Sequence, residues 1–201
     1  MKDDHAIRFF DEQFARQRLG PEVELNPFER LALPHLHGRV LDYGCGMGQL
    51  ALAAARAGCS VLALDASAIA IEHLQRKARA GKLALSAQVA DLREHRLDED
   101  FDSIVSIGLL MFFDCAAALR ALDHLEAHLR PGGSLVLNVL IEGTTYMAMF
   151  DPGSRCLFAR DALVRRYAGW DELELSYSEY PAPGGLMKAF ATMIARKPAR
   201  A

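Results

Sequence analysis

The chain has 201 residues, a formal net charge of −3 and an apolar share of 51%, which together predict one globular domain. Lysines and arginines are scattered and form no basic stripe, which argues against a nucleic-acid partner. Every apolar run is too short to span a membrane, and the start, MKDDHAIRFF, lacks the apolar core of a signal peptide. We therefore expect a soluble, cytoplasmic protein that binds neither nucleic acid nor membranes.

Strand-like and helix-like segments alternate along the chain. The first helix is expected within residues 24–38. Asn26 can cap it, Pro27 suits the first helical position and Glu29 can complete a capping box. A later helix has Asp114 as its cap. The pattern predicts strands at 39–44, 60–65, 83–91, 101–108 and 134–141, helices at 48–58, 66–81, 114–133 and 159–170, and two closing strands at 171–180 and 187–196.

The cysteines give no sign of a metal site or a cross-linked scaffold. They are widely spaced and include no Cys-x-x-Cys pair, so we expect neither zinc nor a disulfide framework. They are better interpreted as isolated small apolar residues, except for the one that lies in a glycine-rich loop. The four are Cys45, Cys59, Cys115 and Cys156.

Continuous apolar strands that alternate with helices indicate an α/β fold, in which helices cover both faces of a parallel sheet. In such sheets a ligand lies at the carboxyl ends of the strands, near the point where the strand order reverses. Asp42, Asp65 and Asp91 all lie at the carboxyl ends of predicted strands. We therefore expect the functional site at that edge of the sheet.

A glycine-rich loop, with Gly44, Gly46 and Gly48, follows the first strand. Glycines permit a tight turn and the close approach of a ligand, and the next helix offers its first N–H groups. Dinucleotide enzymes use the same device with the spacing G-x-G-x-x-G, but Gln49 stands where their third glycine belongs. A Walker phosphate loop is absent as well. The acid Asp42 directly before the loop favours a positively charged ligand.

The loop resembles the first motif of class I S-adenosylmethionine-dependent methyltransferases, and four more motifs follow in the family's order. They are VLDYGCGMGQLA (40–51), VLALD (61–65), VADL (89–92), FDSIVSIGLLMFF (101–113) and LRPGGSLVLNV (129–139). The resemblance implies a Rossmann-like methyltransferase fold. This is a three-layer α/β sandwich around a doubly wound, mostly parallel seven-stranded sheet with an antiparallel last strand. It also implies S-adenosylmethionine as cofactor and S-adenosylhomocysteine as product.

The same resemblance assigns roles to individual residues. Asp42 would lie near the methionine ammonium group, and Asp65 would accept two hydrogen bonds from the ribose diol. Asp91 would accept a hydrogen bond from the adenine amino group, and Ile107 and Gly108 would flank the sulfonium end. The cofactor-binding residues implied in this way are Asp42, Tyr43, Gly44, Cys45, Gly46, Gly48, Asp65, Ala66, Asp91, Leu92, Ile107 and Gly108.

A narrower resemblance links the chain to the tellurite-resistance methyltransferases of the TehB type, which methylate soft oxyanions of tellurium and selenium. It is carried by RFFDEQFARQ (8–17), LLMFF (109–113), LFARDALVRRYAGWDELEL (157–175) and FATMIARK (190–197). That family has a His-Arg pair just before its last strand. Here the segment reads SEYPAPGGLMKAF, in which Lys188 is the only cation.

We expect an N-terminal helical lid at 1–37, a cofactor-binding core at 38–141 and an acceptor-side segment at 142–201. No convincing general base is found on the acceptor side, which favours a soft or already ionised small-molecule acceptor of the tellurite, selenite or thiol type. The catalytic residues stay unassigned. A non-catalytic cofactor-binding protein and a small-molecule O- or N-methyltransferase remain as alternatives. Candidates to line the acceptor pocket are Phe10, Phe14, Met111, Phe112 and Tyr146.

Overall fold

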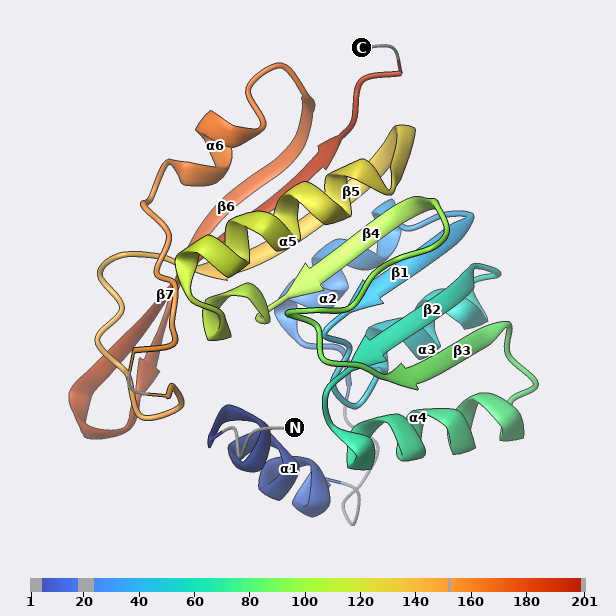
Figure 1. The fold of residues 1–201 in the computed structure, drawn as a ribbon, viewed down its shortest axis with the longest axis horizontal. Helices are drawn as coiled ribbons and strands as arrows, with labels where there is room; N and C mark the ends of the chain where they lie inside the picture. Colours follow the sequence, from blue (N-terminus) through green and yellow to red (C-terminus); the bar gives the residue numbers. More distant parts are fainter. Residues whose placement is uncertain (1–4, 18–23, 152, 200–201) are drawn as a thin grey trace.

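The computed structural model describes residues 5–17, 24–151 and 153–199, and its centre is one seven-stranded sheet (Figure 1). The strand order is β3-β2-β1-β4-β5-β7-β6. β7 runs antiparallel to both of its neighbours, and the other neighbouring strands are parallel. This is the fold expected from the sequence. The strands are β1 (Arg39–Tyr43), β2 (Ser60–Asp65), β3 (Leu85–Val89), β4 (Phe101–Ile107), β5 (Leu129–Leu140), β6 (Asp171–Ala182) and β7 (Leu186–Arg196).

Helices cover both faces of this sheet and complete three layers. Successive strand residues point to opposite faces, so Leu41 packs toward α5 and α6 while Val40 packs toward α3 and α4. α2 lies on the second face as well, where its Ala32 packs against β4, β5 and β7. The helices are α1 (His5–Gln17), α2 (Pro27–Ala32), α3 (Gln49–Arg56), α4 (Ala68–Ala80), α5 (Cys115–Ala127) and α6 (Ala162–Arg166), with short 3-10 helices η1 (Leu33–His35), η2 (Leu110–Phe112) and η3 (Pro183–Gly185).

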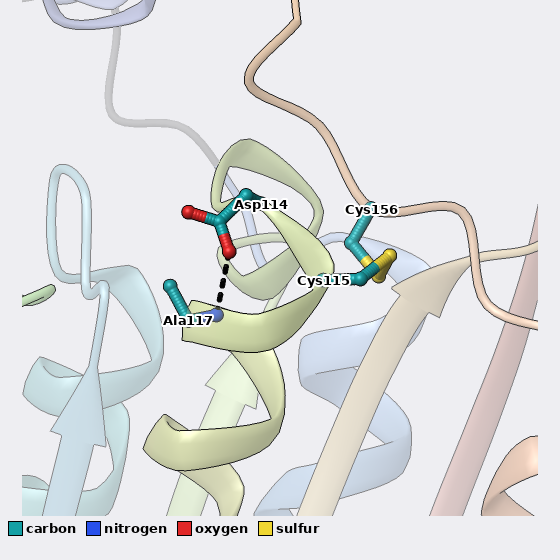
Figure 2. The surroundings of a disulfide bond; sticks show 4 residues. All are labelled: Asp114, Cys115, Ala117 and Cys156. Carbon is teal, nitrogen blue, oxygen red and sulfur yellow. Dashed lines mark hydrogen bonds between the residues drawn. A yellow bond between two sulfur atoms is a disulfide. The ribbon is translucent and has the colours of Figure 1, made fainter.

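Both predicted helix caps are confirmed. The Asn26 side chain accepts hydrogen bonds from the backbone N–H groups of Phe28 (2.9 Å) and Glu29 (3.0 Å), and Glu29 Oε2 accepts one from the Asn26 N–H (2.7 Å). Asp114 Oδ1 accepts a hydrogen bond from the Ala117 N–H at 2.7 Å (Figure 2). Such caps satisfy backbone donors that have no partner within the helix.

The expectation that no disulfide forms is wrong. Cys115, at the start of α5, is bonded to Cys156, 41 residues later (Figure 2). The segment after β5 folds back over the sheet edge. There the Phe158 N–H donates to the Leu140 carbonyl (2.9 Å), and the Cys156 N–H donates to the Met111 carbonyl (3.0 Å). These backbone contacts bring the two cysteines together. Cys45 and Cys59 are free and buried, which for Cys59 agrees with the expectation of an isolated apolar residue.

Several element boundaries also differ from expectation. The helix predicted at 159–170 is reduced to the five residues of α6. The helix predicted at 114–133 ends at Ala127, and β5 begins at Leu129 instead of Ser134. None of the helices in the described ranges has both the length and the apolar character needed to cross a bilayer.

Candidate functional site

The carboxyl ends of β1, β2 and β4 border a cavity of about 610 Å³, which α1 and α2 help to enclose. In Figure 1, α1 lies beyond the edge to which the arrowheads of β1 to β4 point. The cavity therefore lies where the sequence placed the functional site. Its lining includes these residues predicted from the sequence: Phe10, Phe14, Asp42, Gly44, Cys45, Gly46, Asp65, Ala66, Asp91, Leu92, Ile107, Gly108, Met111, Phe112 and Tyr146.

Two predicted residues, Tyr43 and Gly48, lie behind the residues that line the cavity. The Tyr43 side chain packs into the core on the α5 face, and its hydroxyl donates a hydrogen bond to the Leu92 carbonyl. Burial raises the pKa of Tyr43 to about 12. Gly48 precedes α3 with φ +75°, and a Cβ there would lie 2.5 Å from the Leu74 side chain. These residues fix the shape of the loop and do not line the cavity.

The glycine loop is tied to the neighbouring strand by its backbone. The N–H groups of Gly44 and Cys45 both donate to the Leu64 carbonyl, at 2.9 and 3.0 Å. Gly44 has φ +87°, and a Cβ there would lie 2.8 Å from Leu109. This conformation and this close approach both require glycine.

Asp42 presents an unsatisfied acceptor to the cavity. It is 5% exposed, and its Oδ2 has no hydrogen-bond partner among the residues that the structure describes. Burial, reinforced by the negative charges of Glu29 and Asp65, raises the pKa of Asp42 to about 8. A buried oxygen of this kind is stabilised by a ligand that brings a positive charge and N–H donors.

Asp65 is held in place by the backbone of the two loops that flank it. Its Oδ2 accepts a hydrogen bond from the Gly46 N–H (2.8 Å), and its Oδ1 accepts one from the Ser67 N–H (2.9 Å). Burial raises the pKa of Asp65. Each carboxylate oxygen keeps a further lone pair, so the group can still accept two hydrogen bonds from a ligand. Asp91 is exposed at the cavity mouth, where it accepts a hydrogen bond from the Arg93 N–H (3.2 Å).

The helix α1 covers this half of the cavity. Ser67 Oγ donates a hydrogen bond to Asp11 of α1. The Phe14 ring lies against the glycine loop, since a Cβ on Gly46 would be 3.3 Å from its Cζ atom. Phe14, a candidate acceptor-side residue, thus lies over the half that contains the three predicted acids.

The other half of the cavity is lined by aromatic and methionine side chains. The Phe112 ring centroid lies 5.2 Å from that of Phe10 and 5.1 Å from that of Phe150. Phe28 and Phe190 form a second pair at 5.1 Å. Lys188 Nζ lies 5.7 Å from the Tyr146 ring centroid. This half therefore offers apolar walls and one cation.

The cavity lining also includes polar residues that were not predicted as site residues, among them Glu29, Arg93 and Asn138. Glu29 was interpreted only as part of a capping box, although it also faces the cavity. Arg93 lies beside Asp91. Asn138 is 1% exposed, and its Nδ2 donates to Thr192 Oγ1 at 2.9 Å. A single asparagine within the apolar strand LVLNVLI is the signal that could have revealed it.

Within the described ranges, no cluster of three or more histidine, cysteine, aspartate or glutamate side chains could hold an ion.

Comparison with known proteins agrees with this geometry. Residues 40–133 match a family model described as a methyltransferase domain. The chain is 31% identical over 171 residues to hemagglutinin 1 of Eikenella corrodens, covering 80% of this chain and 55% of that protein. It is 27% identical over 171 residues to the probable S-adenosyl-L-methionine-dependent methyltransferase TehB of Haemophilus influenzae, covering 79% and 57%. The chain thus spans a little over half the length of these curated relatives.

Solved structures share the fold. The crystal structure of TehB from Haemophilus influenzae has a TM-score of 0.75 at 23% identity, covering 94% of this chain and 67% of that one. The 1,6-didemethyltoxoflavin-N1-methyltransferase of Burkholderia thailandensis, solved with S-adenosylhomocysteine, has a TM-score of 0.69 at 21% identity, covering 96% and 88%. These likenesses confirm the Rossmann-like fold.

Proposed function

Since this chain belongs to the class I S-adenosylmethionine-dependent methyltransferases, we propose that it transfers the methyl group of that cofactor to a small-molecule acceptor. The observation that supports this most directly is the unpaired, buried Oδ2 of Asp42, which faces the same cavity as Asp65. A cation with N–H donors at Asp42 and a diol at Asp65 are two groups that the cofactor carries.

We propose the following arrangement of the cofactor. Asp42 and the backbone of residues 44–46 would hold its methionine part, Asp65 the ribose and Asp91 the adenine amino group. Ala66 and Leu92 line the same cavity and would contact the adenine ring. The proposed division of labour follows the chain: residues 1–37 cover the site, 38–141 hold the cofactor and 142–201 form the acceptor side. Residues 1–4, 18–23, 152 and 200–201 lie outside the described part.

The proposed methyl transfer requires that the two reactants be aligned more than that either be activated by the protein. The bound cofactor supplies a methyl group that its sulfonium already activates for in-line displacement. The protein would contribute orientation, which can supply about 7–11 kcal/mol of the barrier. Ile107 and Gly108 would flank the reacting centre, and the rings of Phe10 and Phe112 would keep water away from it.

For the acceptor we propose a soft or anionic small molecule of the tellurite, selenite or thiol type. Two observations support this proposal. None of the described residues that line the cavity is a histidine, and a thiolate or oxyanion needs no strong base. Lys188 brings a positive charge to the acceptor half without an ion-pair partner among the described residues. The proposal includes a role in tellurite resistance and a cytoplasmic location.

Asp65→Ala tests the cofactor half. The variant should bind S-adenosylhomocysteine at least about 10-fold more weakly, because a hydrogen bond to a charged group contributes about 1.5–3 kcal/mol. Isothermal calorimetry measures this, with circular dichroism to check the fold. Asp161→Ala is the matched control, since Asp161 is an exposed acid that pairs with Arg165 on α6. The assignment fails if the wild type does not bind, or if Asp65→Ala binds equally well.

Transfer is tested with labelled S-adenosylmethionine and a panel of tellurite, selenite and thiols. Methylation of a member of the panel supports the proposal. Tight cofactor binding without transfer to any of them favours a non-catalytic cofactor-binding protein.

A further inference from the structure

We propose that Asn138 binds the methyl acceptor, and that its side-chain oxygen selects acceptors with an O–H or N–H donor beside the reacting atom. This inference rests on the proposed function and names a feature of its substrate. It starts from a buried polar atom that neither the fold nor the cofactor proposal uses.

Asn138 lies deep in the acceptor half of the cavity. In β5 it lies between Val136, which packs near α2, and Leu140, which packs with the acceptor-side aromatic residues. The strand register pairs it with Ile107 of β4 and Thr192 of β7. Paired residues of neighbouring strands point to the same face, so all three side chains lie on the α2 face of the sheet.

The amide of Asn138 is half satisfied. Its Nδ2 donates to Thr192 Oγ1 at 2.9 Å, which fixes the orientation of the amide. Its Oδ1 is buried and has no hydrogen-bond partner in the part of the chain that the structure describes. A buried acceptor without a partner is costly, and buried polar groups are rarely left that way. Because Asn138 lines the cavity, a bound molecule can supply the missing donor.

The position of Asn138 Oδ1 indicates that it contacts the methyl acceptor and not the methyl donor. The Gly108 N–H donates a hydrogen bond to the backbone carbonyl of Asn138 at 3.0 Å. Asn138 is thus attached to the segment that we propose beside the sulfonium. Asp42 lies two strands away, on β1. A molecule that contacts Asn138 Oδ1 would therefore lie close to the methyl group and away from the methionine ammonium.

The surroundings define the acceptor further. Along β7, Thr192, Phe190 and Lys188 alternate onto the same face. Phe28 packs on Phe190 at 5.1 Å. Along this face the polar side chains of Asn138 and Thr192 are therefore followed by the apolar ring of Phe190 and then by the cation of Lys188. This order fits a small organic thiol with a neighbouring hydroxyl or amine, and it also fits a protonated oxyanion such as hydrogen selenite.

The test uses pairs of thiols that differ only in the donor: 2-mercaptoethanol with 1-propanethiol, and 2-aminobenzenethiol with 2-methylbenzenethiol. Their binding to the protein loaded with S-adenosylhomocysteine is measured by calorimetry, and kcat/KM is measured with S-adenosylmethionine. The wild type should prefer the member with the donor by about 10-fold or more, because the other leaves Oδ1 unpaired. Equal binding, or no binding of either member of both pairs, overturns the inference.

Two variants assign the preference to Asn138. Asn138→Leu should lose the preference while its affinity for S-adenosylhomocysteine stays unchanged, and Asn138→Asp, which keeps an acceptor oxygen, should retain it. A preference that persists in Asn138→Leu contradicts the inference. Because the wild-type preference is measured independently, a variant that fails to fold does not remove the test. If the wild type does not bind S-adenosylhomocysteine, the proposed function itself is refuted.

Discussion

Asp42 and Asn138 each present an unpaired, buried oxygen to one cavity. Around Asp42 the negative charge is concentrated, because Glu29 and Asp65 both act on its carboxyl group. A pyrophosphate would be repelled there, whereas a cationic methionine group is attracted. The side chains therefore support the same choice of ligand that Gln49 indicated in the sequence, against a dinucleotide.

The raised pKa of Asp42, about 8, gives a prediction for cofactor binding. An ammonium group binds best to the ionised carboxylate, so affinity for S-adenosylhomocysteine should rise with pH until about pH 8. Below that pH, the association constant should rise by nearly tenfold per pH unit, as expected when binding releases one proton. Calorimetry between pH 6 and 9 measures it. Asp42→Asn should bind weakly with little pH dependence, and the same slope in that variant would exclude Asp42 as its origin.

The raised pKa of Asp42 also predicts how the stability of the folded protein changes with pH. The pKa of Asp42 is higher in the folded protein than its ordinary value of 3.8, so the folded state binds more protons between about pH 4 and pH 8. Stability of the cofactor-free protein should therefore fall as the pH rises through this window. Thermal unfolding should show a smaller fall in Asp42→Asn.

At the scale of elements, local signals were sufficient where the structure depends on neighbouring residues. The caps at Asn26 and Asp114 involve residues no more than three positions away, so they could be predicted from the sequence. The alternation of strand residues would also have shown that Tyr43 points away from the face of Asp42. The disulfide could not be predicted, because it depends on how the segment after β5 folds back onto α5.

This disulfide should stabilise the acceptor-side segment. Closing a loop of 41 residues restricts the unfolded chain, and such bonds typically contribute about 2–4 kcal/mol. Cys156→Ser should lower the free energy of unfolding by that amount in urea denaturation. A reducing agent should have the same effect on the wild type and none on the variant. Equal stability of oxidised and reduced wild type would contradict this prediction.

For the whole molecule, the two halves of the cavity differ in how far the sequence reveals them. The family model matches residues 40–133, which include Asp42, Asp65 and Asp91 in the half of the cavity proposed to bind the methyl donor. Most acceptor-side features lie outside that range, including Tyr146 and Lys188. The five family motifs fall within residues 40–139, and they therefore describe the half proposed to bind the methyl donor. The acceptor half arises from contacts between distant segments, so its lining could not be assembled from the sequence, although the asparagine within LVLNVLI was a signal for Asn138.

One helix covers both halves of the cavity. α1 places Phe14 against the glycine loop, and its Phe10 packs on Phe112 in the acceptor half. The bond between Asp11 and Ser67 fastens the helix to the loop that follows β2. α1 thus lies over both the half proposed for the methyl donor and the half proposed for the acceptor.

This cover should impose an order on the kinetic cycle. In the proposed arrangement the methyl donor lies beneath α1, so we expect it to bind first and the methylated product to leave before S-adenosylhomocysteine. S-adenosylhomocysteine should therefore inhibit competitively against S-adenosylmethionine and noncompetitively against the acceptor in initial-rate measurements. Phe14→Ala should speed its dissociation and weaken that inhibition. The reaction rate would then depend on the ratio of S-adenosylhomocysteine to S-adenosylmethionine, and the position of a single helix would be the cause.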